Sequence, residues 1–281
     1  MKDRKKGKLR QFIKDLQTEI KKNKNVAAVY IILRILVIAV AVVSLVSGNI
    51  ENFFLCILSL VLFLLPAFVE RKFKVDLPDA LEIIVLLFIF AAEILGEISS
   101  FYVRVPHWDT MLHTVNGFLF AAIGFAMVDV LNRSSRVKFN LSPFYLAVMA
   151  FCFSMTVGVL WEFFEFGMDM LVGFDMQKDT VINSITSVTF DTTASNQTVA
   201  FHDIVDTVII GADGSQYVFS DYGVKGYVDT GIVDTMKDLI VNFIGAVVFS
   251  VVGFFYVKSR GKGKIAKNLI PTLNESEEVT E

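Results

Sequence analysis

The stretch of sequence that decides the fold is Val233–Val257, which reads VDTMKDLIVNFIGAVVFSVVGFFYV. Its charged residues are confined to the first turns, and no charge follows Asp238. A helix needs roughly 20 apolar residues to cross the hydrocarbon core of a bilayer. The stretch therefore predicts a membrane-spanning helix that begins with a polar turn.

The remainder of the chain has the same character. Of its 281 residues 54% are hydrophobic, and the mean hydropathy is +0.59. The net charge of −3 excludes a typical nucleic-acid binder, because no net positive charge is available to neutralise phosphates. The sequence predicts an all-α membrane protein, a six-helix transmembrane bundle. Its other five spans are about 26–46, 53–69, 79–98, 109–131 and 143–166.

The cations predict the orientation of these spans. Of the 26 Lys and Arg, 21 lie before Val26, at 71–74, at 133–138 and from Lys258 onward, so they fall in alternate connections. Because cytoplasmic loops are enriched in Lys and Arg, both termini are predicted to be cytoplasmic in a plasma or bacterial inner membrane. The six-span domain then covers 26–257.

Two terminal segments flank this domain. Residues 1–25 are basic, with apolar residues at helical spacing, and they favour an amphipathic helix on the anionic inner leaflet. An ordinary solvated basic tail is the alternative. Residues 258–281 end in an acidic run and are predicted to be a disordered cytoplasmic tail.

A long connection, about 167–231, separates the last two spans on the predicted outer side. Val208–Ile210 and Tyr217–Phe219 flank Ala212-Asp213-Gly214, a pattern typical of a β-hairpin. Nine Asp against two Lys give this connection a charge of −7. We expect a small, acidic, extracytoplasmic insertion containing β-hairpins.

Polar residues gather at the predicted outer ends of four spans. Ionisable residues in lipid are costly, so several at one depth favour a shared site. The alternative is that acids lie in interfacial water and that the tryptophans form an aromatic belt. The residues are Glu93 and Glu97; Trp108, Asp109 and His113; Trp161, Glu162, Glu165 and Asp169; and Asp234, Asp238 and Asn242.

Crowded carboxylates cannot all remain ionised without a compensating charge. Shared protons, a bound metal or a cationic substrate group would each supply it. Oxygen ligands with one imidazole suit Mg²⁺, Mn²⁺, Ca²⁺ or, less well, Zn²⁺. The candidate metal ligands are Asp109, His113, Glu162, Glu165, Asp234 and Asp238, and the same set without Asp234 is the candidate catalytic set. Glu93, Glu97, Asp169, Asn242, Trp108 and Trp161 are candidate supporting residues.

Three motifs carry a family resemblance: WD-x2-LH-x3-G from Trp108 to Gly117, WE-x2-E from Trp161 to Glu165, and DT-x2-D-x3-N-x2-GA from Asp234. In this order they resemble the YjdF-type bacterial inner-membrane family of unknown function. A fainter similarity is to VanZ-like proteins, from which the chain departs at Glu165, where those tend to have Gln, and in its long hairpin loop. The resemblance implies the same site residues but no substrate.

Three classes of function fit these features. A metal-assisted hydrolase or transferase would act on a lipid-linked or envelope substrate at the outer leaflet, with His113 as general base. A cation- or proton-coupled transporter would use the same acids. A non-catalytic envelope or assembly factor would bind a partner through the external hairpin. The sequence leaves the oligomeric state undetermined.

Overall fold

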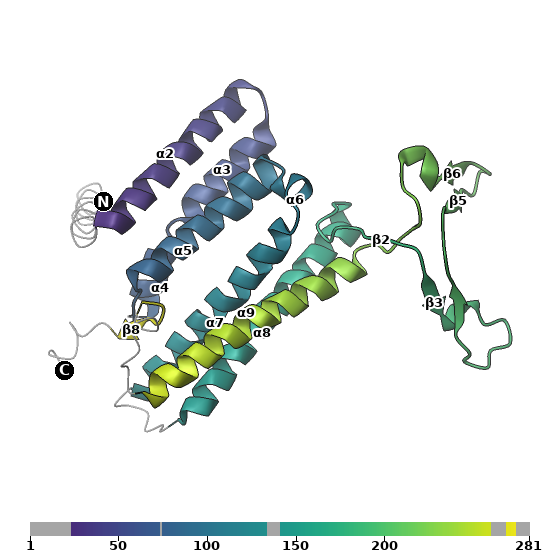
Figure 1. Ribbon diagram of the computed structural model, residues 1–281. Coiled ribbons are helices and arrows are strands. Elements are labelled where there is room, and N and C mark those ends of the chain that lie inside the picture. Colours follow the sequence, from purple (N-terminus) through teal and green to yellow (C-terminus); the bar gives the residue numbers. More distant parts are fainter. Residues whose placement is uncertain (1–23, 74, 134–140, 260–267, 274–281) are drawn as a thin grey trace, which may run out of the picture. The chain divides into compact units, whose positions relative to one another are not determined.

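The structure is a computed structural model that describes residues 24–73, 75–133, 141–259 and 268–273 (Figure 1). The predicted amphipathic segment before Lys24 lies outside these residues. The chain divides into two compact units, one comprising Met1–Gly158 with Ile240–Glu281 and the other Val159–Leu239.

Among the described residues, five helical segments are long and apolar enough to cross a membrane, in agreement with a multi-pass membrane protein. The second of them consists of two helices separated by a two-residue turn. Each overlaps a predicted span. They are α2 (Lys24–Val46), α3 with α4 (Ile50–Leu62 and Leu65–Phe73), α7 (Trp108–Arg133), α8 (Pro143–Val172) and α9 (Ile232–Lys258).

The span predicted at 79–98 takes a different form. It begins as the α-helix α5 (Asp79–Phe90) and continues as the π-helix η1 (Ala91–Ile98). The amide of Ser99 donates to the carbonyl of Ile94, five residues earlier, over 3.0 Å. A π-helix arises where the hydrogen-bond register widens to i→i+5, a feature often found at functional sites. The short helix α6 (Phe101–Arg104) follows.

Two apolar clusters hold the first unit together. One joins α5 to α7, α8 and α9, with Phe125 and Phe249 fully buried and their ring centroids 6.0 Å apart. The other joins α2 and α3 to α5 and η1 around Val37, Cys56 and Leu86. The helices therefore pack into a bundle, as the sequence predicts.

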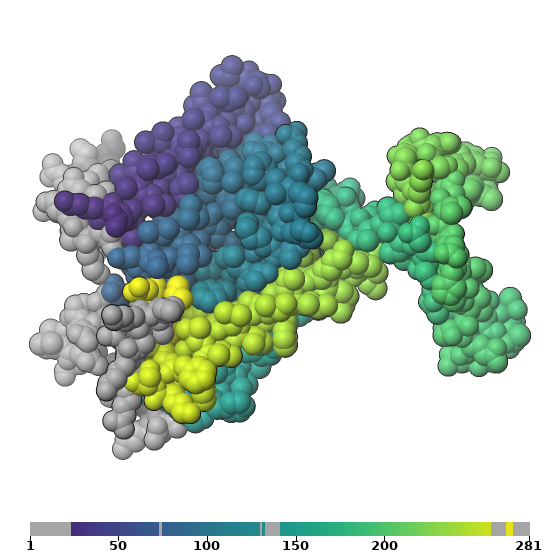
Figure 2. Space-filling model, in the orientation of Figure 1, coloured from purple at the N-terminus to yellow at the C-terminus, as the bar shows by residue number. Residues whose placement is uncertain are grey.

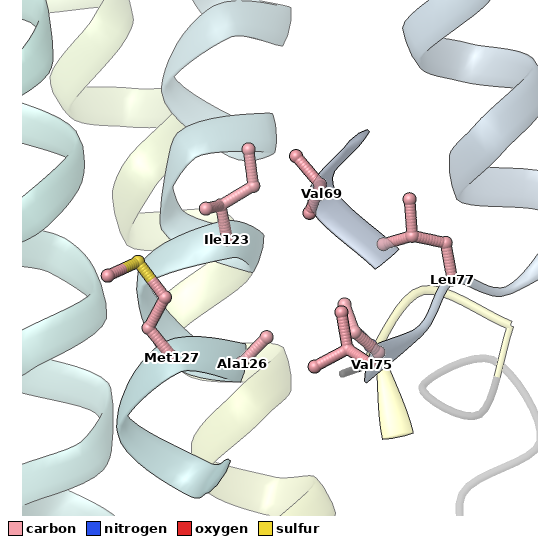
Figure 3. Close-up of a pocket in the computed structure, with 7 residues that line it drawn as sticks. Val69, Val75, Leu77, Ile123, Ala126 and Met127 are labelled. Atoms are coloured by element: carbon pink, nitrogen blue, oxygen red, sulfur yellow. The ribbon is translucent and has the colours of Figure 1, made fainter. Parts of the chain in front are cut away.

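The predicted disordered tail contains an ordered piece. Thr272–Leu273 forms strand β8, which pairs antiparallel with β1 (Val75–Asp76), and Ile270 is 1% exposed in the core. Figure 2 shows this yellow segment beside the blue residues near β1. Next to the sheet, apolar side chains of α4, β1 and α7 line a small pocket (Figure 3). The expectation of disorder is therefore wrong for 268–273, because its apolar residues bury themselves in the bundle.

The second unit contains three small antiparallel sheets between α8 and α9. The predicted hairpin is present: β5 (Val208–Ile210) pairs with β6 (Gln216–Val218), and Gly214 adopts φ +84° in the turn. The other pairs are β2 (Val181–Ile182) with β7 (Tyr227–Val228) and β3 (Ile185–Ser187) with β4 (Val199–Phe201). The single-turn 3-10 helices are η2 (Val188–Phe190) and η3 (Phe219–Tyr222).

Candidate functional site

Asp109, which is half-buried, and His113, which is buried, form a pair at the start of α7. They are four residues apart, so helical geometry places them on one face. Nε2 of His113 lies 3.5 Å from Oδ1 of Asp109, and the side chains are 11% and 32% exposed, respectively. An imidazole and a carboxylate are thus held together within a helix that is otherwise apolar enough to cross a membrane.

One turn further along this face, α7 packs closely against α9, and each helix contributes a glycine to the contact. A Cβ atom on Gly117 would lie 2.1 Å from the backbone oxygen of Asn242, and one on Gly245 would lie 2.0 Å from the backbone oxygen of Thr114. Both distances are far shorter than any van der Waals contact. The two helices therefore touch backbone to backbone, a packing that small residues permit in membrane bundles.

Asn242 is buried at this crossing, with 1% of its surface exposed. Its Nδ2 donates to Sδ of Met155 over 3.6 Å, whereas its Oδ1 has no hydrogen-bond partner among the described residues. On the α8 side, a Cβ atom on Gly158 would lie 2.6 Å from Nδ2. A buried carboxamide oxygen without a partner requires an explanation, such as a water molecule or a bound ion.

A serine ties α8 to the same crossing. Oγ of Ser154 donates to the backbone oxygen of Gly117 over 2.7 Å, and Ser154 is fully buried. The sequence reasoning missed this contact, because a serine in an apolar run resembles any other small residue. Three helices thus converge where Gly117, Asn242 and Gly158 meet.

In the second unit, three predicted site residues are buried. Glu162, Glu165 and Asp238 are 5%, 8% and 3% exposed, respectively. Nε1 of Trp161 donates to Oε1 of Glu165 over 2.8 Å. The indole is therefore a hydrogen-bond partner of a candidate ligand as well as a residue suited to an aromatic belt.

Two other predicted carboxylates bind backbone amides. Asp169 accepts hydrogen bonds from the amides of Met176 (2.6 Å) and Gln177 (2.8 Å). Asp234 accepts one from the amide of Lys178 (2.8 Å). These contacts give both acids a structural explanation that competes with the predicted metal-ligand and supporting roles.

Asp229 is a buried carboxylate that the sequence reasoning did not single out. It accepts from the amides of Thr180 and Val233, each over 2.7 Å, and from that of Gly231 over 3.3 Å. Burial raises the pKa of Asp229, but these amides outweigh burial and hold the pKa below its ordinary value. Its position in the sequence could have indicated this role, because an aspartate just before a helix often caps the helix N-terminus.

The remaining predicted site residues lie elsewhere in the first unit. Glu93, half-buried, and Glu97, exposed, both belong to the π-helix. The ring of Trp108 packs edge-on against Phe101 with centroids 4.9 Å apart. Nε1 of Trp108 is buried and finds no hydrogen-bond partner within the described ranges.

Asp129 is a further buried acid that the sequence reasoning missed. It lies near the opposite end of α7 from His113 and is 7% exposed. The sequence could have indicated this residue, because an aspartate flanked by valines inside a membrane span costs free energy unless it has a role. The half of this span remote from His113 is therefore less apolar than predicted.

Acids organise the hairpins of the second unit, and the half-buried Asp206 is an example. It accepts from the hydroxyl of Ser220 (2.6 Å) and from the amides of Ser220 (3.0 Å) and Thr207 (2.8 Å). The Ser220 hydroxyl, followed by these amides, lowers the pKa of Asp206. A carboxyl whose pKa is depressed by folding stabilises the fold above its unfolded value of about 4 and loses that contribution as pH falls through the folded pKa.

We therefore expect acidification to destabilise the hydrogen bonds of Asp206 to Thr207 and Ser220. Hydrogen exchange at the amides of Thr207 and Ser220, corrected for intrinsic rates, should show less protection at about pH 3 than at pH 7. The variant Asp206→Asn should already be less protected at pH 7 and should show a smaller pH dependence. Equal pH dependence in both proteins would contradict the assignment.

Helices of this length, composition and number define a multi-pass integral membrane protein. A family model described as "Predicted membrane protein (DUF2238)" matches residues 29–259, and the chain belongs to this family. The match covers all five long apolar segments except the first residues of α2. The resemblances to YjdF-type and VanZ-like proteins rest on the three motifs alone.

The chain is also similar to an uncharacterized protein of Thermotoga maritima, with 27% identity over 124 residues. The alignment covers 43% of this chain and 62% of that relative, so it spans less than two thirds of the relative's length. No solved structure matches the chain.

Proposed function

We propose that the protein is a membrane-embedded, divalent-cation-dependent hydrolase or transferase that acts on a lipid-linked or envelope substrate at the outer leaflet. The observation that carries this proposal is the Asp109–His113 pair in α7, whose imidazole is buried. Ionisable residues inside a membrane segment are expensive and mark functional sites by default. The proposal includes α5 with η1 as a sixth span and both termini in the cytoplasm, as the distribution of Lys and Arg predicts.

Asp109 and His113 are the proposed cation ligands in the first unit. Asp238, in the second unit, is a further candidate ligand from the sequence. Helix periodicity places His113 one turn before Gly117 in α7. Gly117 and Asn242 are the residues at which α7 and α9 touch.

Glu162 of α8, in the second unit, is likewise a candidate ligand from the sequence, and it is 5% exposed. Glu165 and Asp234 are assigned to the periphery, because Trp161 and the amide of Lys178 already bind them. Carboxylates with one imidazole suit Mg²⁺, Mn²⁺, Ca²⁺ or Zn²⁺.

The proposed chemistry follows from these groups. A divalent cation polarises a phosphoryl or carbonyl oxygen and acidifies a bound water. A neighbouring carboxylate would accept the proton of that water, and Asp109 would orient the His113 ring toward the cation through their contact. The Oδ1 of Asn242, which has no partner in the described part of the chain, would accept a hydrogen bond from the substrate or from an ordered water.

Cation binding tests the site. With the full chain in nanodiscs, we expect about one Mn²⁺ per chain, and Asp109→Asn or His113→Gln should each weaken binding about tenfold or more by loss of a ligand. Binding would be followed by electron paramagnetic resonance of free Mn²⁺. The control, Asp221→Asn, removes one exposed negative charge from the second unit. Equal affinity in all four proteins would exclude the proposed ligands.

Turnover tests the chemistry separately. We expect the wild-type protein with Mn²⁺ or Mg²⁺ to release phosphate from a lipid phosphate or diphosphate, and Asp109→Asn and His113→Gln to abolish release. If cation binding is confirmed and no turnover is found over a panel of such lipids, the enzymatic part of the proposal is wrong.

A second candidate, a non-catalytic envelope or assembly factor, is favoured by the surface of the second unit. Large apolar side chains are exposed there, including Val205 (77%), Ile210 (68%) and Tyr222 (71%). Exposed apolar groups of this kind are typical of partner-binding surfaces. If deleting 181–228 abolishes the cellular phenotype while Asp109→Asn has no effect on it, this candidate replaces the first.

A further inference from the structure

An apolar groove runs between α8 and α9 at the ends of these helices remote from the second unit. Its walls come from residues 144–151 of α8 and 247–255 of α9, including Ala147, Val251 and Phe254. Ser250 also lines the groove, but its Oγ is buried beneath the surface. The groove therefore presents carbon atoms to whatever occupies it.

The walls of the groove belong to membrane-spanning segments and are open to the surroundings. Phe144, Val251 and Phe255 are 69%, 49% and 58% exposed, respectively. At the depth of the hydrocarbon core, the surroundings are acyl chains rather than water. At the end of the groove nearer Asn242, the phenyl rings of Phe151 and Phe243 pack against each other, with their centroids 5.3 Å apart.

A cation lies at the other end of the groove. Lys258 is the last residue of α9, four residues beyond Phe254, or about 6 Å along the axis. Its Nζ lies 5.6 Å from the centroid of the Phe254 ring, and Lys258 is exposed. An apolar groove with a lysine at its end complements an amphiphile that carries a chain and a negative head.

We propose that this groove binds one acyl chain of an anionic phospholipid, with the lipid phosphate at Lys258. The charge favours this occupant over a second copy of the chain, because a symmetric copy would bring another Lys258 to the same seam. A single lysine near the headgroups contributes about a fivefold preference for an anionic lipid. The site uses none of the proposed cation ligands, so it stands independently of the proposed function.

Photolabelling tests the groove. The full chain would be reconstituted in phosphatidylcholine nanodiscs with trace phosphatidylglycerol or phosphatidylcholine carrying a diazirine on one acyl chain. We expect labels to concentrate on 144–151 and 247–255, with about fivefold more from phosphatidylglycerol. Lys258→Gln should remove this headgroup preference and leave chain labelling, whereas Val251→Trp, which fills the groove, should reduce labelling by both lipids.

Ile35→Trp is the matched control, because Ile35 is exposed on α2 outside the groove. It should leave the pattern unchanged, and thermal unfolding would verify that every variant is folded. Labels spread evenly over the exposed faces of α2, α8 and α9 would overturn the groove as a lipid site. Equal labelling of the wild type by the two lipids would overturn the assignment of Lys258. Cross-linking of Val251→Cys to its counterpart in another chain would replace the lipid by a second copy.

Discussion

Replacing Gly245 by leucine will force α7 and α9 apart and strongly destabilise the bundle. Even the first side-chain carbon would lie 2.0 Å from the backbone oxygen of Thr114, so no rotamer avoids the collision. Overpacking that a side chain can relieve costs about 1–3 kcal/mol, and here a helix backbone must move. We expect a loss of about 3 kcal/mol or more, measured by reversible unfolding of the full chain in detergent.

The chain offers a matched control for this substitution. Gly167 is also helical, in α8. Apart from its own backbone, its chain neighbours and the adjacent backbone of α8, no heavy atom of the described residues lies within 4 Å of the Cβ atom that a substitution would add. Gly167→Leu should therefore cost less than about 1 kcal/mol and could raise stability, because leucine favours a helix more than glycine does. Similar losses in both variants would mean that the α7–α9 crossing does not depend on backbone contact.

The same crossing also links stability to the site. In Gly117→Ala the added carbon meets the backbone of Asn242, the residue whose side-chain oxygen has no partner within the described part of the chain. A shift there would move His113, one turn away on the same helix. Loss of Mn²⁺ affinity in a folded Gly117→Ala protein would be consistent with the proposed ligands.

The spans were predictable because membrane helices need long apolar segments, and α2, α7, α8 and α9 satisfy that requirement within their own sequence. The pair at Asp109 and His113 was predictable for the same local reason, since four-residue spacing defines one helix face. The hairpin between Val208 and Val218 followed from its turn sequence. Each of these features depends on residues that are neighbours in the chain.

The features that the sequence did not reveal depend on distant residues or on small changes of register. The π-helix of η1 differs from an α-helix by a shift of one residue in its hydrogen bonds, and apolar periodicity does not report that shift. Strand β8 forms through pairing with a strand almost 200 residues earlier. In sequence, Asp234 resembles a metal ligand and Asp169 a supporting residue of the site. Only the backbone amides that bind these two carboxylates in the structure supply another explanation.

The same ambiguity makes Asp229 the most informative acid in the second unit. Its carboxylate accepts from the amide of Thr180 before β2 and from that of Val233 in the first turn of α9. The carboxylate therefore links the two ends of the connection between α8 and α9, and it also caps the N-terminus of α9. Hydrogen bonds to a charged group contribute about 1.5–3 kcal/mol each, so Asp229→Ala should cost this unit about 3 kcal/mol.

Limited proteolysis of the full chain in nanodiscs would measure this loss. If cleavage within 175–228 requires local opening, a cost of about 3 kcal/mol accelerates it roughly 100-fold. The control Asp221→Ala removes the same charge from an exposed position and should change the rate less than about twofold. Equal acceleration by both variants would attribute the effect to net charge rather than to the capped helix. A selective effect of Asp229→Ala with unchanged Mn²⁺ affinity would separate the acids that build this connection from those proposed to bind the cation.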